Sequence, residues 1–265
     1  MFSLARVREA ADLLWECWND GRRIDALPES VRPTSRVEGY LIQSVLEIRE
    51  EPPLYGWKIA ATSGAGQSHI GVDGPLAGRL LASRVFEDGG ELPFGANGMA
   101  VAEPEFAFRM ARDLAPRDVA YDMSDVLAAV ETLHPAIEVP DARYDDFASV
   151  GGPQLIADNA CAHQFVLGPA APEAWRDIDL RYHTVQGSVS SGLMREGNGA
   201  NVLGDPRIAL TWLANELSGL EETLKAGQVV TTGTCIIPLE VAPGDAVRAD
   251  FGEFGTVALR FSEKF

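Results

Sequence analysis

After about residue 80, the chain is divided into short runs typical of β-strands, and this pattern limits the folds open to it. The runs are separated by Gly, Pro and Asp turns. Two helical patterns interrupt them, at residues 125–133 after the possible cap Ser124, and at residues 205–217, where Pro206 suits a first helical turn. We therefore expect a strand-dominated domain of the α+β class. The runs are RLLASRVF, MAVAEPEFAFRMA, PAIEVPDA, HQFVLG, IDLRYHTVQG, SVSSGLMREG, QVVTTGT, DAVRADFG and GTVALRF.

The first 80 residues differ, because they contain two amphipathic helical patterns. Apolar residues recur at helical spacing over residues 3–19, with Ser3 as N-cap, and over residues 36–49, where EEPP ends the pattern. LYGWKIAAT then predicts a short buried strand, and SGAGQSHIGVDGPLAG predicts a glycine-rich loop. These patterns predict a small N-terminal helical α/β region at 1–80 and a larger domain at 81–265.

Charge and cysteine content exclude several classes of protein. The net charge of -17 argues against nucleic acid or an anionic membrane as a partner, since both favour basic surfaces. An anionic small substrate remains compatible, because a bound divalent cation reverses the local sign. Three cysteines without metal-site spacing indicate a reducing compartment, by default the cytoplasm. Neither a signal peptide nor a run of about 18 apolar residues is evident.

Two glutamates lie in the apolar stretch AVAEPEFAF, which is an unusual place for charge. In a strand, Glu103 and Glu105 point to one face while Pro104 and Phe106 point to the other. Glu138 interrupts a similar apolar run. The pair alone is compatible with a solvated edge strand, which Pro104 would mark. Three carboxylates without nearby His or Cys ligands instead suit a hard cation such as Mg²⁺ or Mn²⁺.

Lys58, between Trp57 and Ile59, is a second candidate functional residue. Its ammonium either extends to water from the end of a strand or lies desolvated near the acidic cluster. In the second case Lys58 would pair with the carboxylates or transfer protons. The four histidines are scattered without sequence partners, so structural roles are expected for them. The glycine-rich loop lacks the strand and helix that a dinucleotide site needs. Cys161 has His163 nearby but no nucleophile motif around it.

Several motifs in one order resemble the 2-keto-4-pentenoate hydratase branch of the fumarylacetoacetate hydrolase superfamily. The resemblance covers most of the chain from about residue 36 to the end. Several motifs in a single order are more specific than any one of them. The motifs are GWKIA, IGVDGP, AEPEFAF, AIEVPDARY, ADNACAHQFVLG, GANVLGDPRIALTWLANEL and LKAGQVVTTGT.

The resemblance implies a fold, a cofactor and an assembly. It implies a C-terminal mixed β-roll, Mg²⁺ or Mn²⁺ held by Glu103, Glu105 and Glu138, and a homo-oligomer. Lys58 corresponds to the family lysine and Asp73 to the loop aspartate, and both are candidate catalytic residues. The candidate substrate-binding residues are Asp141, Asn159 and Cys161. Related members often carry serine where Cys161 stands, so a hydroxyl is here a weaker thiol donor.

The resemblance also implies a reaction, in which a hydratase adds water to a 2-hydroxy-2,4-dienoate to give a 4-hydroxy-2-oxo acid in aromatic catabolism. Decarboxylation of a 2-oxo-3-enedioate is the alternative, because it stabilises the same enolate. C–C hydrolysis is less favoured, since no lid pairing histidine with glutamate is evident. An inactive assembly subunit is a further alternative, against which the retained acidic residues and Lys58 argue. Arg79, Arg84 and Arg143 are candidates for meeting a distal substrate carboxylate.

Overall fold

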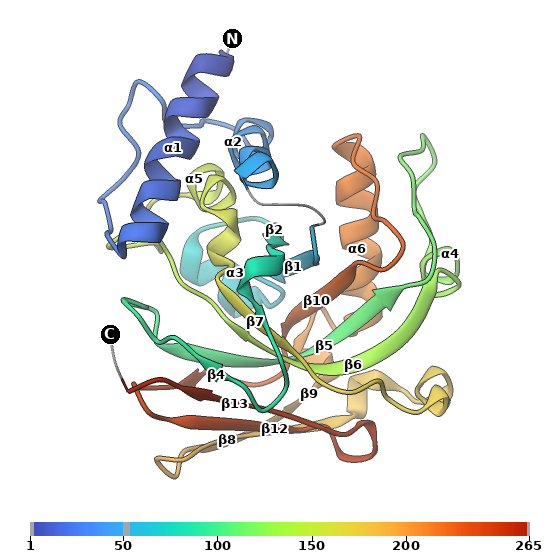
Figure 1. Cartoon of the computed structure of the whole chain (residues 1–265). Coiled ribbons are helices and arrows are strands. Elements are labelled where there is room, and N and C mark those ends of the chain that lie inside the picture. Colours follow the sequence, from blue (N-terminus) through green and yellow to red (C-terminus); the bar gives the residue numbers. More distant parts are fainter. Residues whose placement is uncertain (1–2, 50–53, 264–265) are drawn as a thin grey trace.

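The computed structural model describes residues 3–49 and 54–263, and in these ranges the strands form two sheets in separate layers. In Figure 1 the smaller sheet lies beneath the larger sheet, while α1, α2 and α5 lie above the larger sheet. The helices are α1 (Leu4–Asp20), α2 (Arg36–Arg49), α3 (Gly64–Ile70), α4 (Met123–Leu127), α5 (Gly152–Ala157) and α6 (Pro206–Gly219). Short 3-10 turns are η1 (Ala82–Arg84), η2 (Asn159–Cys161), η3 (Glu173–Asp177), η4 (Leu180–Tyr182), η5 (Gly199–Asn201) and η6 (Gly252–Phe254).

The larger sheet mixes parallel and antiparallel pairs, and its centre is formed by the two longest strands. Its order is β2-β1-β10-β5-β6-β7-β3, with β11 paired to one end of β5. The pairs β1–β10 and β3–β7 are parallel, whereas β5–β6 is antiparallel. Its strands are β1 (Gly56–Ala60), β2 (Leu76–Leu80), β3 (Val85–Phe86), β5 (Val101–Met110), β6 (Val130–Val139), β7 (Gln164–Leu167), β10 (Val229–Thr234) and β11 (Leu239–Glu240).

The smaller sheet packs against one face of β5 and β6. Its order is β4-β13-β12-β8-β9, from β4 (Glu91–Leu92), β8 (Thr184–Val189), β9 (Met194–Asn198), β12 (Ala246–Asp250) and β13 (Thr256–Phe261). Phe106 of β5 lies edge-on to Phe251, which follows β12, with ring centroids 5.1 Å apart. Aromatic burial of this kind holds the two layers together. Phe108 meets Trp175 of η3, with ring centroids 5.8 Å apart. Glu103 and Glu105 lie together on one face of β5, and Phe106 packs on Phe251 from the other, as expected.

The N-terminal helices form where the sequence predicts them. Ser3 caps α1 by accepting from the amide of Arg6, and Gly21 ends the helix in a left-handed conformation. The buried faces of α1 and α2 meet through residues such as Leu14 and Ile42. The EEPP segment, expected to end the second helix, lies outside the described residues.

Several local predictions are wrong, including the run IDLRYHTVQG, where Leu180–Tyr182 forms η4 and β8 begins only at Thr184. The expected glycine-rich loop contains α3, because Ser63 caps the amide of Gly66 and Gly71 closes the helix. The helix expected at 125–133 is only the short α4, and the residues from Val130 onward belong to β6, because pairing with β5 overrides their helical spacing. The expected run RLLASRVF is divided, since Ala82–Arg84 forms η1 between β2 and β3. Helix α5 was not expected.

An α+β fold with mixed sheets is confirmed, whereas its description as a roll stays a prediction. Strands β1 and β2 come from the first 80 residues but extend the sheet built by later strands. The proposed division at residue 80 therefore crosses a continuous sheet, and it also stays a prediction.

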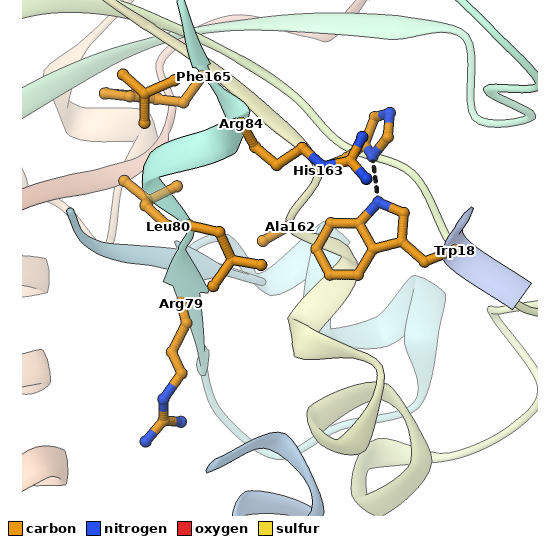
Figure 2. Close-up of a pocket in the computed structure, with 9 residues that line it drawn as sticks. Trp18, Arg79, Leu80, Arg84, Ala162, His163 and Phe165 are labelled. Carbon is orange, nitrogen blue, oxygen red and sulfur yellow. Dashed lines mark hydrogen bonds between the residues drawn. The ribbon is translucent and has the colours of Figure 1, made fainter. Parts of the chain in front are cut away.

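Trp18 ties α1 to the start of β7. Its indole N–H donates to Nδ1 of His163 at 2.8 Å, and the guanidinium of Arg143 lies 4.3 Å from its ring centroid. Figure 2 shows this contact in a small hollow that is also lined by Leu80, Arg84 and Phe165. Burial, reinforced by the charge of Arg143, lowers the pKa of His163 to about 3. The ring therefore stays neutral and accepts a hydrogen bond from the indole N–H.

The neutral state of His163 predicts a loss of stability in acid. The folded pKa lies below the ordinary value, so the unfolded chain takes up the proton first as the pH falls from about 6.5 towards 3. The free energy of unfolding should then fall by at most about 1.4 kcal/mol per pH unit from this group. Urea unfolding at pH 7, 6, 5 and 4 measures it, with His163→Asn as the comparison. Equal pH dependence in both proteins would contradict the assignment.

Candidate metal centre

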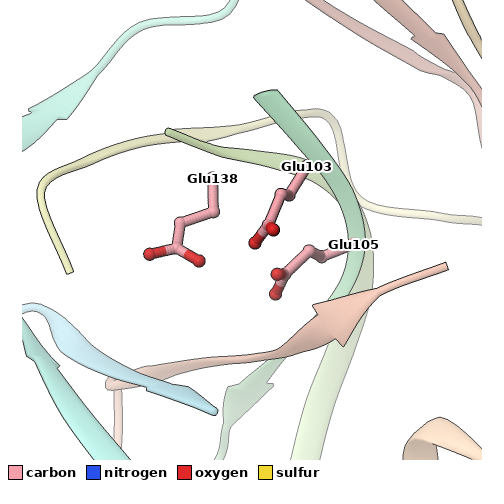
Figure 3. Close-up of side chains that lie close together, drawn as sticks. All are labelled: Glu103, Glu105 and Glu138. Carbon is pink, nitrogen blue, oxygen red and sulfur yellow. The ribbon is translucent and has the colours of Figure 1, made fainter. Parts of the chain in front are cut away.

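Glu103, Glu105 and Glu138 converge on one face of the larger sheet. Alternation along β5 places Glu103 and Glu105 on the same face, and the antiparallel register sets Glu138 of β6 directly opposite Glu103. One oxygen from each carboxylate lies within 4.8 Å of the other two. Figure 3 shows the three groups pointing towards one another. This face is opposite the one that carries Phe106 and the smaller sheet.

The carboxylates are crowded and incompletely paired. Glu105 and Glu138 are fully buried, and Oε1 of Glu105 and both carboxylate oxygens of Glu138 have no hydrogen-bond partner among the described residues. Burial raises the pKa of Glu138 to about 8 against the lowering effect of Lys58, with Glu103 adding to the rise. Burial and the like charges of Glu138 and Glu103 raise the pKa of Glu105 well above its ordinary value. The cluster thus needs positive charge.

Lys58 supplies part of that charge from β1. Its ammonium lies 3.0 Å from Oε2 of Glu138 and donates to the carbonyl of Ala160 at 3.1 Å, and its side chain is almost fully buried. Burial alone would lower the pKa of Lys58, but the three carboxylates outweigh it and raise the pKa. The alternative in which Lys58 extends to water is therefore wrong, and the ammonium lies desolvated at the acidic cluster.

The donor set fits a hard divalent cation. The candidate ligand atoms are all carboxylate oxygens, and such ligands suit Mg²⁺ and Mn²⁺. Zn²⁺ sites differ, because they typically include sulfur or nitrogen ligands. Lys58 offsets one of the three negative charges, and the remaining two match a divalent ion. The unpaired Oε1 atoms of Glu105 and Glu138 are free to bind it. The solvated-strand alternative is wrong for Glu105 and Glu138, which are buried.

The carbonyl that binds Lys58 belongs to a strained segment. Asn159, Ala160 and Cys161 have φ values of 55°, 49° and 61°, a left-handed region that costs about 1–2 kcal/mol per residue with a β-carbon. The segment runs close to β2, where a β-carbon on Gly78 would lie 2.3 Å from the carbonyl oxygen of Asn159. Such strain persists only where surrounding contacts impose it.

Those contacts come from two side chains. The amide of Asn159 accepts from the backbone N–H of Arg79 at 2.6 Å and donates to its carbonyl at 2.9 Å, as a neighbouring strand would. Arg143 binds both sides of the segment, donating to the carboxylate and carbonyl of Asp158 and to the carbonyl of Ala162. Asn159 and Arg143 therefore hold the Ala160 carbonyl towards Lys58.

The structure places the other predicted substrate-binding residues in different settings. Cys161 is buried, and desolvation raises the pKa of its thiol to about 12. The carboxylate of Asp141 is engaged by Arg23 at 2.9 Å and by the amide of Gly98 at 2.9 Å. Asn159 uses its amide on the backbone of Arg79. Their roles towards substrate stay predictions.

Asp73 lies apart from these residues. It is exposed between α3 and β2, and no hydrogen bond or ion pair joins it to the described carboxylate cluster. Its negative charge acts on Arg36, which itself binds Glu216 at 2.6 Å. The structure therefore brings Lys58 to the cluster and leaves Asp73 outside it.

The three candidate arginines are engaged within the chain. Arg79 pairs with Glu47 and Glu222, and Arg143 pairs with Asp158. Arg84 lies over the ring of Trp18, 5.2 Å from its centroid. The histidines take structural roles, as expected: His134 bonds to Gly168, His163 to Trp18 and His183 to Phe251, and His69 packs on Phe147.

Sequence reasoning missed the residues that orient the site. Thr231 and Gly233 of β10 donate to Glu105, and Ala160 accepts from Lys58. The motif VVTTGT carried one usable signal, since a glycine inside a strand pattern indicates a bulge. Nothing in the sequence indicated Ala160, because the interaction uses its backbone carbonyl.

Comparison with known proteins identifies the family. The family model described as fumarylacetoacetate (FAA) hydrolase C-terminal matches residues 81–262. The 2-keto-4-pentenoate hydratase of Burkholderia vietnamiensis is 32% identical over 262 residues, 98% of this chain and 96% of the relative. This chain belongs to the fumarylacetoacetate hydrolase family. The resemblance noted in the sequence is confirmed.

Two further relatives extend the comparison, one by sequence and one by structure. The 2-hydroxyhexa-2,4-dienoate hydratase of Comamonas testosteroni is 31% identical, covering 94% of this chain and 95% of that protein. The structure of the 4-oxalocrotonate decarboxylase from Pseudomonas putida G7, complexed with magnesium and adipate, has a TM-score of 0.89. It is 26% identical and covers 98% of this chain and 99% of its own. Hydratases and a decarboxylase of the fumarylacetoacetate hydrolase family thus both resemble this chain.

Substitution of Asn159 should be costly for stability. In Asn159→Ala, the N–H and carbonyl of Arg79 lose their partners in a buried setting, and alanine tolerates the left-handed region less well than asparagine. We expect a loss of about 3 kcal/mol in the free energy of unfolding, measured in urea by tryptophan fluorescence.

A matched control is available in Asn215. Its amide accepts from the N–H of Tyr121 at 2.7 Å and donates to its carbonyl at 3.0 Å, but it lies in α6 and is only partly buried. Asn215→Ala should therefore cost less. If both variants lose the same stability, the strained segment does not depend on Asn159 in the way described.

Proposed function

We propose that this member of the fumarylacetoacetate hydrolase family is a divalent-metal-dependent hydratase acting on a 2-hydroxy-2,4-dienoate. The observation that carries the proposal is the cluster of Glu103, Glu105 and Glu138, in which Glu138 pairs with the buried Lys58. The full-length likeness to 2-keto-4-pentenoate hydratases supports the reaction. Mg²⁺ or Mn²⁺ is the proposed ion, and a decarboxylase of similar fold has been solved with magnesium and with calcium.

The chemistry assigns separate roles to the ion and to the side chains. A divalent cation held by the three glutamates supplies Lewis-acid stabilisation of negative charge on the substrate's C2 oxygen. Glu105 and Glu138 present their unpaired oxygens to it. The ammonium of Lys58 donates to the carbonyl of Ala160 and forms an ion pair with Glu138, and an ammonium with three N–H donors has capacity left for substrate or water.

Hydration needs two proton additions and one hydroxyl addition to the diene. The C2 hydroxyl loses its proton and C5 gains one, which gives a 2-oxo-3-enoate. Water then adds its hydroxyl to C4 and a proton to C3, which gives the 4-hydroxy-2-oxo acid. We assign Lys58 to orienting the substrate and transferring a proton, because its ammonium lies at the cluster. Asp73, on its exposed loop, is proposed to assist from the substrate side.

Decarboxylation of a 2-oxo-3-enedioate is the second candidate. It is favoured by the likeness to 4-oxalocrotonate decarboxylase over nearly the whole of both chains. The same cluster would stabilise the enolate that remains when CO₂ departs.

Several finer assignments accompany the proposal. We keep the division at residue 80, substrate contacts by Asp141, Asn159 and Cys161, a homo-oligomeric assembly and a cytoplasmic location. Within residues 3–49 and 54–263, every helix is too short or too polar to cross a bilayer.

Product identity tests the proposed reaction. With Mg²⁺ or Mn²⁺, the protein should consume 2-hydroxypenta-2,4-dienoate, seen as loss of diene absorbance, and form 4-hydroxy-2-oxopentanoate, identified by NMR. EDTA should abolish turnover, and Lys58→Met should lower kcat by about 100-fold or more. CO₂ release from a 2-oxo-3-enedioate, without turnover of the dienoate, would replace hydration by decarboxylation.

Binding of Mn²⁺ should stabilise the fold through Glu105. At 100-fold excess over Kd, a ligand of the folded state adds about 2.7 kcal/mol, or roughly 5–10 °C in Tm for a chain of this size. Glu105→Gln should remove this shift in Tm, measured by calorimetry. Glu131→Gln, which changes an exposed carboxylate on β6, should keep it. A full shift in Glu105→Gln would show that the ion binds elsewhere.

A further inference from the structure

Glu105 is held differently from the other two carboxylates of the cluster. Its Oε2 accepts from the hydroxyl of Thr231 and from the backbone N–H of Gly233, the latter at 2.8 Å. Its Oε1 is buried and unpaired among the described residues. One oxygen is therefore anchored by two neutral donors while the other faces the cluster.

A β-bulge in β10 brings these two donors to one oxygen. Thr231 pairs with Ala107, but the next register position pairs Thr234 with Glu105, so β10 contains one residue more than β5 over this stretch. The bulge turns the N–H of Gly233 from the ladder towards Glu105. Gly233 has φ of 99°, and a β-carbon there would lie 2.0 Å from Oγ1 of Thr62, so the position requires glycine.

Thr231 and its neighbour Thr232 are both fully buried but use their hydroxyls differently. Thr231 donates to Glu105, whereas Thr232 donates to the carbonyl of Phe106 at 2.9 Å. The two threonines thus form a natural comparison, with the same chemistry, burial and strand but different targets.

We propose that Thr231, with the bulge at Gly233, is a positioning residue that sets the affinity of the site for a divalent cation. The inference rests on the proposed metal site and extends it to residues that do not themselves contact the ion. Because Oε2 is fixed, Oε1 of Glu105 does not have to be ordered when the ion binds. Partners that orient a ligating carboxylate in this way typically change metal affinity by about 10–100-fold when removed.

Mn²⁺ affinity of the metal-free protein, measured by isothermal titration calorimetry, tests this directly. Thr231→Val, close in shape but without the hydroxyl, should weaken Mn²⁺ binding by about 10–100-fold. Thr232→Val should bind within about two-fold of the unchanged protein, although it loses a buried hydrogen bond too. Thr231→Ser keeps the hydroxyl donor and should bind Mn²⁺ about as tightly as the unchanged protein. If Thr231 acted through packing alone, Thr231→Ser would lose affinity as well, because it lacks the methyl group.

The outcomes separate this inference from the proposed function. Should Thr231→Val bind Mn²⁺ as tightly as the unchanged protein, the positioning role is overturned while the metal site stands. Absence of Mn²⁺ binding in the unchanged protein would overturn the site, and the inference with it. If Thr231→Val does not fold, Thr231→Ala and Thr231→Ser, which differ by one oxygen, replace it, and equal affinities in this pair would overturn the inference.

Discussion

The repulsion among three closely spaced carboxylates, two of them fully buried, is the constraint around which this structure is arranged. Moving one ion into a protein interior costs several kcal/mol, and a second or third like charge nearby adds to it. The chain meets this cost from different directions. β1 brings the ammonium of Lys58, β10 brings the hydroxyl of Thr231 and the N–H of Gly233, and the remaining charge suits a divalent ion. The contributions of the protein itself come from β10, which is adjacent to β5, and from β1, which is the next strand in the same sheet.

Irregular backbone accompanies this arrangement on both sides of the cluster. Cys161 and its two predecessors are left-handed on the side of Lys58, and Gly233 has a positive φ on the side of Glu105. In both places, an irregular backbone directs a polar group at a charged side chain: a carbonyl at an ammonium, and an N–H at a carboxylate. Regular strands point these groups along the ladder, so a sheet has to be interrupted to do this.

Sequence patterns predicted the face of β5 that carries charge but not what stabilises it. Alternation suffices to place Glu103 and Glu105 together, whereas Glu138 joins them only through the register of β6, which periodicity does not determine. The likeness to known motifs supplied that link. Residues 130–133 have helical spacing, yet pairing with β5 draws them into a strand. Interactions of backbone groups, such as that of the Ala160 carbonyl, cannot be predicted from the identity of the side chain.

The ion pairs of two candidate arginines bear on which substrates the site favours. A 2-oxo-3-enedioate carries a second carboxylate, and burying it requires a cation at the far end of the substrate. Arg79 pairs with Glu47 and Glu222, which are partly exposed, and Arg143 pairs with the buried Asp158, so a dicarboxylate that used either arginine would compete with an existing ion pair. Breaking the buried Arg143–Asp158 pair would cost about 3–5 kcal/mol. A 2-hydroxypenta-2,4-dienoate has no second carboxylate and makes no such demand. The ion pairs of these two arginines thus favour a substrate with one carboxylate, while the metal end of the site would serve either reaction.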